Sequence, residues 1–83
     1  MLIRSPRELA LLVVSQRKKL KLSQTAVGKL VGLKQQTVSD FENNPEGTKL
    51  KTIFHILSAV QLDLKAFTKD EPASVKTKWK KEW

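Results

Sequence analysis

Apolar residues recur every three or four positions in successive segments of the chain, which is the spacing of one face of an α-helix. The first segment begins with a strong start signal. Ser5 is a suitable N-cap, Pro6 suits the first helical position, and Glu8 at the third position completes a capping box. One face of the segment that follows is formed by Leu9, Leu12, Val13, Gln16 and Leu20, of which all but Gln16 are apolar. This pattern predicts a helix that ends near Lys21.

Residues 22–44 predict two short helices joined by a tight turn. Ser23 is a good N-cap for the first helix. Gly28 lies within this helix and lets another backbone approach closely. Gly32 follows the last apolar residue, where a helix often ends in the left-handed conformation that glycine adopts cheaply. The apolar face of this first helix is formed by Val27, Leu30 and Val31.

The second of the two helices, predicted from Lys34 to Asn44, has one apolar and one polar face. Val38 and Phe41 lie on the apolar face. The polar side chains on the other face are Gln35, Gln36, Ser39 and Asn43. A glutamine can donate and accept on one base edge, so a short helix led by such residues meets the requirements for reading the major groove of DNA. The alternative is that these residues only form a solvated face.

After a loop at Asn43–Gly47, apolar residues return at helical spacing from Leu50 to Val60. Within this predicted helix, Ile53, Phe54, Ile56 and Leu57 supply the apolar positions. His55 is the only histidine, so no metal site is expected there. Leu62, Leu64 and Phe67 then alternate with polar residues, which indicates a short strand or the start of a fifth helix. Because no second strand is evident, we expect this strand to pair with its counterpart in another copy, forming a ribbon across a homodimer.

The chain has 83 residues, which suffices for one small domain, and its net charge of +8 favours a polyanionic partner. Residues 1–68 carry 11 Lys+Arg against 5 Asp+Glu, and residues 69–83 carry 5 against 3, so most of the excess charge lies outside the C-terminal tail. There is no cysteine and no segment that predicts a signal peptide or a membrane span. These features lead us to expect a cytoplasmic, nucleoid-associated protein without a membrane partner.

Residues 69–83 predict a flexible tail, because they are rich in charged and small residues and contain Pro72. The two tryptophans of the chain, Trp79 and Trp83, both lie in this tail. A large aromatic ring on a mobile segment is typical of an anchor for a protein partner, although Trp83 folding back onto its own domain is an equal alternative. We therefore expect a domain over residues 1–68 that binds DNA and dimerises, followed by a partner-binding tail.

An enzyme is not expected from the residues available. The chain has one histidine, no cysteine and no glycine-rich phosphate loop. Asp40 and Glu42 lie two apart on a predicted helix and therefore point in different directions. No catalytic residue, cofactor or metal is predicted.

The segment LSQTAVGKLVGLKQQTVSDFEN resembles the helix-turn-helix of the Cro/C1-type, lambda-repressor-like family. The resemblance covers about residues 5–60 and implies a mainly α, compact domain of four to five helices, to which the short C-terminal strand is added. It also implies that Arg17 and Glu42 form a structural pair. Gly28 departs from the more usual alanine, and this change is expected to loosen the first helix slightly.

A narrower similarity, to HipB-type antitoxins, covers GLKQQTVSDFENNPEGTKLKTIFHIL, LDLKAF and the terminal Glu82-Trp83. It implies a dimeric transcriptional repressor that binds palindromic operators in double-stranded DNA, regulates its own operon and neutralises a HipA-type serine/threonine kinase toxin in a type II toxin–antitoxin module. It further implies that Trp83 enters a pocket on the kinase. The residues expected at bases or phosphates are Gln24, Lys34, Gln35, Gln36, Thr37, Ser39 and Asn43.

Two other functions fit the same residues. One is a stand-alone phage-type repressor without a toxin, and a kinase-like neighbouring gene would argue against it. The other is an adaptor that binds a protein through Trp79 and Trp83 and contacts DNA only incidentally. A preference for an upstream palindrome over a scrambled duplex would argue against the adaptor.

Overall fold

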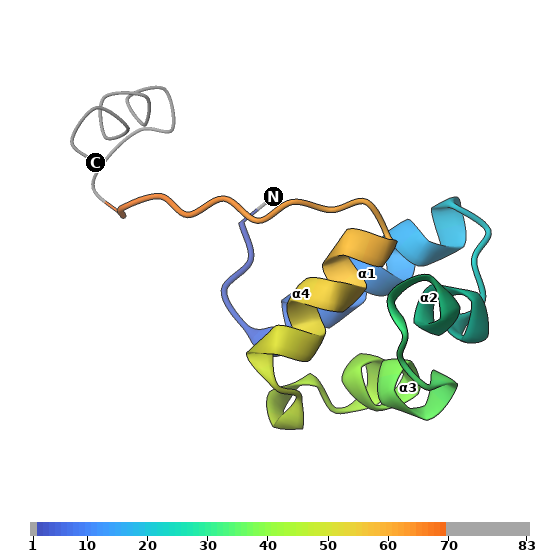
Figure 1. Ribbon diagram of the computed structural model, residues 1–83. Helices are drawn as coiled ribbons and strands as arrows, with labels where there is room; N and C mark the ends of the chain where they lie inside the picture. Colours follow the sequence, from blue (N-terminus) through green and yellow to red (C-terminus); the bar gives the residue numbers. More distant parts are fainter. Residues whose placement is uncertain (1, 70–83) are drawn as a thin grey trace.

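Four α-helices and one turn of 3-10 helix form in residues 2–69, the part of the chain that this computed structural model describes. They are α1 (Pro6–Lys19), α2 (Gln24–Val31), α3 (Gln35–Asn43), η1 (Pro45–Gly47) and α4 (Leu50–Ala59) (Figure 1). The expectation of a mainly α fold with four helices is confirmed. None of the helices in this part of the chain is long and apolar enough to cross a bilayer. Most of the predicted tail, including Trp79 and Trp83, lies outside the described residues.

The predicted N-caps of α1 and α2 are confirmed. The Ser5 hydroxyl accepts a hydrogen bond from the backbone N–H of Glu8 at 3.1 Å, and the Ser23 hydroxyl accepts one from Ala26 at 3.0 Å. The capping box was predicted incorrectly in one detail. The Glu8 carboxylate accepts from the backbone N–H of Arg4 and not from that of Ser5, so it binds the chain one residue further from the helix.

Three helices end in the same way, with a residue in the left-handed conformation. Gly32 has φ 72°, as the sequence predicts for α2, but Lys21 after α1 and Gln61 after α4 have φ 60° and 61° without being glycine. In each case the next backbone N–H donates to a carbonyl five residues earlier, which satisfies a helix-end carbonyl. These bonds are Leu22 to Arg17, Leu33 to Gly28 and Leu62 to Leu57, at 3.0, 2.8 and 2.9 Å.

The core lies where the four helices meet. α2 packs against both α3 and α4, while α1 packs against α3 and η1. The largest side chains that are fully buried are Phe41, Ile56, Val13, Val27, Val38 and Val60. Gln16, on the predicted apolar face of α1, donates to the Val60 carbonyl at 3.2 Å and so connects α1 to the end of α4.

Three residues that the apolar pattern placed on buried faces are instead exposed. They are Leu30 on α2, and Leu50 and Phe54 on α4, with 62%, 63% and 51% of their surface accessible. Each helix here is short and buries only a narrow stripe against its neighbours, so apolar residues at the edge of the stripe face outward. The exposure of Leu50 and Phe54 makes part of the α4 surface apolar.

The segment after α4 leaves the helical body as an extended chain (Figure 1). Leu62 packs against the core, whereas Leu64 and Phe67 are 49% and 41% exposed. Within residues 2–69 this segment forms neither a strand nor a fifth helix. The expected ribbon needs two chains, so pairing through Leu62, Leu64 and Phe67 stays a prediction.

Candidate nucleic-acid interface

The position of α3 relative to α2 is set by a close backbone contact at the turn. Gly28 is buried, and a Cβ atom at this residue would run into the carbonyl oxygen of Leu33. The backbone N–H of Leu33 also donates to the Gly28 carbonyl at 2.8 Å. Gly28 therefore allows the turn to close tightly onto α2. The sequence predicted that a backbone would approach Gly28 closely, but it did not indicate that this backbone belongs to the turn.

The orientation of α3 about its own axis is set by Val38 and Phe41, both with no accessible surface. Because these two residues face the core, the opposite side of α3 faces outward. Among the residues expected to contact DNA, Lys34, Gln35, Gln36 and Asn43 are exposed, whereas Gln24, Thr37 and Ser39 are half-buried. The exposed residues include the first two of the helix, which a major-groove reading helix would present to base edges.

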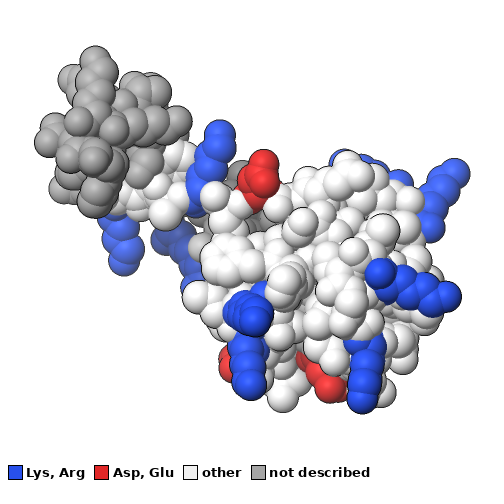
Figure 2. Space-filling view, viewed as in Figure 1, with Lys and Arg blue, Asp and Glu red and all other residues white. Residues whose placement is uncertain are grey.

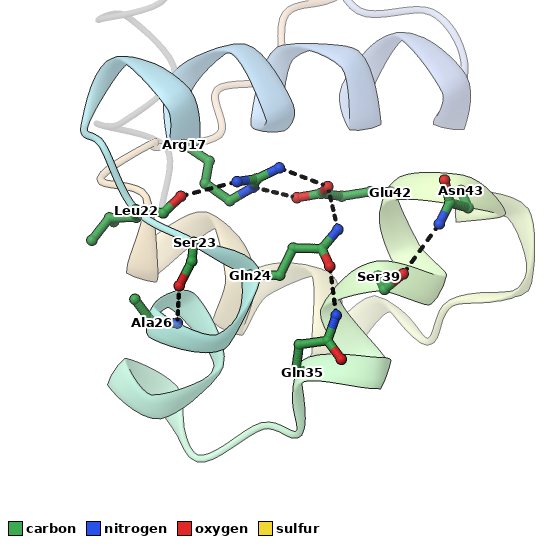
Figure 3. Close-up of polar contacts among 9 residues, drawn as sticks. All are labelled: Arg17, Leu22, Ser23, Gln24, Ala26, Gln35, Ser39, Glu42 and Asn43. Carbon is green, nitrogen blue, oxygen red and sulfur yellow. Dashed lines mark hydrogen bonds and ion pairs between the residues drawn. The ribbon is translucent and has the colours of Figure 1, made fainter.

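Arg17 and Glu42 form an ion pair between α1 and α3 (Figure 3). Arg17 Nε donates to Glu42 Oε2 at 2.7 Å, and Nη2 donates to Oε1 at 3.1 Å, which is the bidentate geometry that suits a guanidinium and a carboxylate. Arg17 Nη1 also donates to the Leu22 carbonyl at 2.9 Å. The two side chains are only 13% and 6% exposed, so the pair holds helices together and leaves little of Arg17 for an external partner.

Gln24 connects this ion pair to the start of α3. Its Nε2 donates to Glu42 Oε1 at 2.8 Å, and its Oε1 accepts from Gln35 Nε2 at 2.6 Å (Figure 3). The family resemblance placed Gln24 among the residues expected at bases or phosphates, and neither of these two bonds was expected. No pattern within the sequence points to them, because the three residues are brought together only when α2 and α3 pack.

Two further pairs lie along α3, each joining residues one helical turn apart. Gln36 Nε2 donates to Asp40 Oδ1 at 2.8 Å, and Asn43 Nδ2 donates to the Ser39 hydroxyl at 3.1 Å. Both pairs are exposed, so water and a ligand compete with them. The polar face of α3 is thus partly preorganised, with each amide already oriented by a neighbour.

The cationic side chains lie mainly at the margins of the face seen in Figure 2, and the middle of that face has few charges. Near the helix-turn-helix, the exposed cations are Lys18, Lys19, Lys21, Lys29 and Lys34. Of the two acidic residues in α3, Glu42 is neutralised by Arg17, and only Asp40 is exposed. This distribution is suited to a polyanion.

A shallow hollow lies between α4 and the segment that follows it. Its lining includes Phe54, Leu57, Leu62 and Leu64. Two of these side chains, Phe54 and Leu64, are also among the exposed apolar residues. The hollow therefore joins exposed apolar residues of α4 to the extended segment, and Ser58, Gln61 and Asp63 make the rest of its lining polar.

Comparison with known proteins agrees with this arrangement. The helix-turn-helix family matches residues 14–67. Antitoxin HipB of Escherichia coli strain K12 is 40% identical over 62 residues, which are 75% of this chain and 70% of that protein. Antitoxin HipB of Escherichia coli O6:H1 has the same identity over 62 residues, 66% of its length.

Solved structures give the same result in three dimensions. A chain in a HipA-HipB-O2-O3 complex superimposes with a TM-score of 0.81 and 36% identity, covering 84% of this chain and 99% of that one. A chain in a HipB-O4 20mer complex gives a TM-score of 0.80 with the same identity and coverage. The chain therefore belongs to the helix-turn-helix family and, within it, to the HipB antitoxins.

Proposed function

We propose that this protein is a dimeric, sequence-specific repressor that reads a palindromic operator with the outer face of α3. The observation that carries the proposal is the orientation of α3. Its anchors, Val38 and Phe41, are fully buried, and Gln35 and Gln36 at its start are exposed together with Lys34. Side chains of these types recognise base edges and phosphates in the major groove.

The side chains along α3 and the lysines around it contact different parts of the DNA in this proposal. Gln35 and Gln36 contact bases, while Lys34 contacts a base or the adjacent phosphate. Thr37, Ser39 and Asn43 contribute further along the groove, the first two only at their exposed edges. The surrounding lysines supply affinity that does not depend on sequence, by releasing counterions from the DNA, so binding is expected to weaken steeply with salt.

The proposed dimer uses the extended segment after α4. Leu64 and Phe67 expose apolar surface, and Leu64 also lines the hollow together with Phe54 and Leu62. An extended segment has backbone groups suited to pairing with a second copy. Such a dimer would place two α3 helices about 34–36 Å apart, one turn of DNA, on an inverted repeat.

The antitoxin role is proposed from the family. HipB antitoxins are the relatives of this chain, and one similar solved structure is a HipA-HipB-O2-O3 complex. We infer that this protein likewise binds and neutralises a HipA-type serine/threonine kinase and represses its own operon. The proposed anchors for the kinase, Trp83 and Trp79, lie outside the described residues.

A mobility-shift assay tests DNA recognition most simply. The protein is titrated against palindromes from the region upstream of its own gene and against scrambled duplexes of the same composition. We expect a clear preference for one palindrome and a strong loss of binding with added salt. Equal binding to all duplexes would remove the repressor proposal and favour an adaptor that contacts DNA incidentally.

Co-purification tests the antitoxin role. The full chain and a Trp83→Ala variant are each expressed with the product of the adjacent gene. We expect a stable complex with the full chain and a weaker one with the variant, while Trp79→Ala shows whether the second tryptophan contributes. If neither chain retains a kinase-like partner, the protein is a stand-alone repressor.

A further inference from the structure

Asp40 places a negative charge on a face of the protein that is otherwise suited to a polyanion. It is exposed on α3, and within residues 2–69 no Lys or Arg side chain forms a salt bridge with it. The other acidic residue of this helix, Glu42, is only 6% exposed and is bound by Arg17. A carboxylate without a cation repels phosphates, so Asp40 opposes the attraction that the surrounding lysines provide.

The position of Asp40 on α3 places its carboxylate beside the amide of Gln36. The two residues are four apart, which is an offset of about 40° around the helix axis. Gln36 Nε2 donates to Asp40 Oδ1 at 2.8 Å, and both side chains are exposed. Val38 and Phe41 face the core, so this contact lies on the outward side of the helix. A base that Gln36 contacts is therefore close to the carboxylate as well.

An ionised carboxylate offers only acceptor oxygens, and this limits the bases that it can contact. In Asp40 one oxygen, Oδ1, accepts from Gln36, while Oδ2 accepts no hydrogen bond from residues 2–69. In the major groove cytosine presents one polar group, the N4 amino donor. Guanine presents the acceptors N7 and O6, thymine presents the acceptor O4, and adenine presents an acceptor beside its donor. Oδ2 is therefore matched best by cytosine.

We propose that Asp40 is a specificity-determining residue, which accepts a hydrogen bond from a cytosine of the operator and repels DNA that presents acceptors at that position. The proposal rests on the contact of Gln36 with bases proposed above. The lysines of a chain with net charge +8 attract DNA of any sequence. A repulsive group on the reading face weakens that attraction wherever the sequence does not match, and so increases the difference in affinity between operator and random DNA.

Asp40→Asn tests the proposal because it removes the charge and keeps the shape of the side chain. The asparagine carbonyl oxygen still accepts a hydrogen bond from Gln36, so the arrangement on α3 is preserved. Dissociation constants are measured by fluorescence anisotropy at one salt concentration, on the preferred palindrome, on random DNA, and on palindromes in which each base pair is replaced in turn. Glu46→Gln is the matched control, because it also removes one negative charge from an exposed residue, but outside α3.

Asp40→Asn is expected to bind random DNA more tightly, by roughly threefold or more, because one repulsive charge is lost. At one base pair of the palindrome the unmodified protein should prefer cytosine, and this preference should fall by roughly fivefold or more in Asp40→Asn. Asp40→Glu keeps the charge, so its binding to random DNA should stay as weak as that of the unmodified protein. Glu46→Gln should leave the ratio of affinities for palindrome and random DNA unchanged. Circular dichroism melting verifies that each variant is folded.

An unchanged ratio of affinities for palindrome and random DNA in Asp40→Asn would overturn the proposal and leave Asp40 as a solvated partner of Gln36. A preference that is lost at a base other than cytosine would overturn the assignment of the base. Gln36→Ala separates these failures from a failure of the proposed function. If Gln36→Ala lowers the ratio and Asp40→Asn does not, α3 reads bases without Asp40. If neither variant lowers it, the proposed contact of Gln36 with bases is wrong as well.

Discussion

The helix-turn-helix and the segment that follows α4 differ in how much apolar surface they leave exposed. In the helix-turn-helix, Val27, Val38 and Phe41 are fully buried, and the half-buried side chains of Gln24 and Glu42 are hydrogen-bonded within one chain. In the segment after α4, Leu64 and Phe67 keep 49% and 41% of their surface accessible, and the backbone is extended. The first region buries its apolar side chains within one chain, and the second exposes apolar surface of the kind that a second chain covers.

This difference predicts that substitutions in the two regions will be detected by different measurements. A change in the helix-turn-helix should alter the free energy of unfolding of the single chain. A change in the extended segment should alter association and leave the folded helices as they are.

Breaking the ion pair should give the largest loss of stability. Arg17→Met leaves the Glu42 carboxylate, only 6% exposed, without its cation, and we expect a loss of about 3–5 kcal/mol in the free energy of unfolding. Urea denaturation measures this loss. The double variant Arg17→Met/Glu42→Leu should recover part of it, because no unpaired charge remains. A double variant that is as unstable as the single one would show that packing, and not the unpaired charge, causes the loss.

Gly28→Ala should destabilise the protein although alanine is the better helix former. The new methyl group would meet the Leu33 carbonyl, which belongs to the backbone of the turn and cannot rotate away. We expect a loss of about 1–3 kcal/mol, measured by thermal or urea unfolding. Lys29→Ala, an exposed change on the same helix, should stay within about 0.5 kcal/mol. A stabilised Gly28→Ala would mean that the turn can open without cost.

Phe67→Ser should weaken the proposed dimer by about 1–2 kcal/mol, roughly tenfold in its dissociation constant, because the proposed interface would lose a large aromatic side chain. Sedimentation equilibrium measures the association. Lys65→Ser, in the same extended segment, is the control and should leave association nearly unchanged. The prediction is wrong if Phe67→Ser lowers the stability of the isolated chain and leaves its association as before.

Lys21→Gly should have the smallest effect. Lys21 has φ 60°, a conformation that glycine adopts without the steric cost that a side chain brings. Glycine also has more freedom to lose on folding, so the net gain should be below about 1 kcal/mol. Gln61→Gly, at φ 61° after α4, offers the same comparison near the extended segment. A clear loss of stability in both variants would argue that the two side chains make stabilising contacts of their own.

The sequence predicted the regions whose signals are local. Ser5 and Ser23 are N-caps and Gly32 ends α2, because each depends on one residue type at one backbone position. Lys21 and Gln61 have the same left-handed conformation as Gly32, and nothing in their residue type indicates it. At both positions the next residue, Leu22 or Leu62, packs against the core. We attribute the left-handed conformation to this packing, because lysine and glutamine do not favour that conformation by themselves.

The contacts of the candidate site were less predictable than its position. The polar face of α3 followed from the spacing of Val38 and Phe41, and Arg17 with Glu42 followed from the family resemblance. The bonds of Gln24 depend on how α2 packs against α3, which periodicity cannot specify. The exposure of Phe54 was missed for a related reason, because spacing alone does not show how wide a buried stripe is.

The proposed function requires α3 to face outward and to choose among DNA sequences. The most direct test is the affinity of Gln35→Ala for the preferred palindrome and for random DNA, measured side by side at one salt concentration. We expect a loss of about 1–3 kcal/mol on the palindrome and much less on random DNA. An equal loss on both would contradict it.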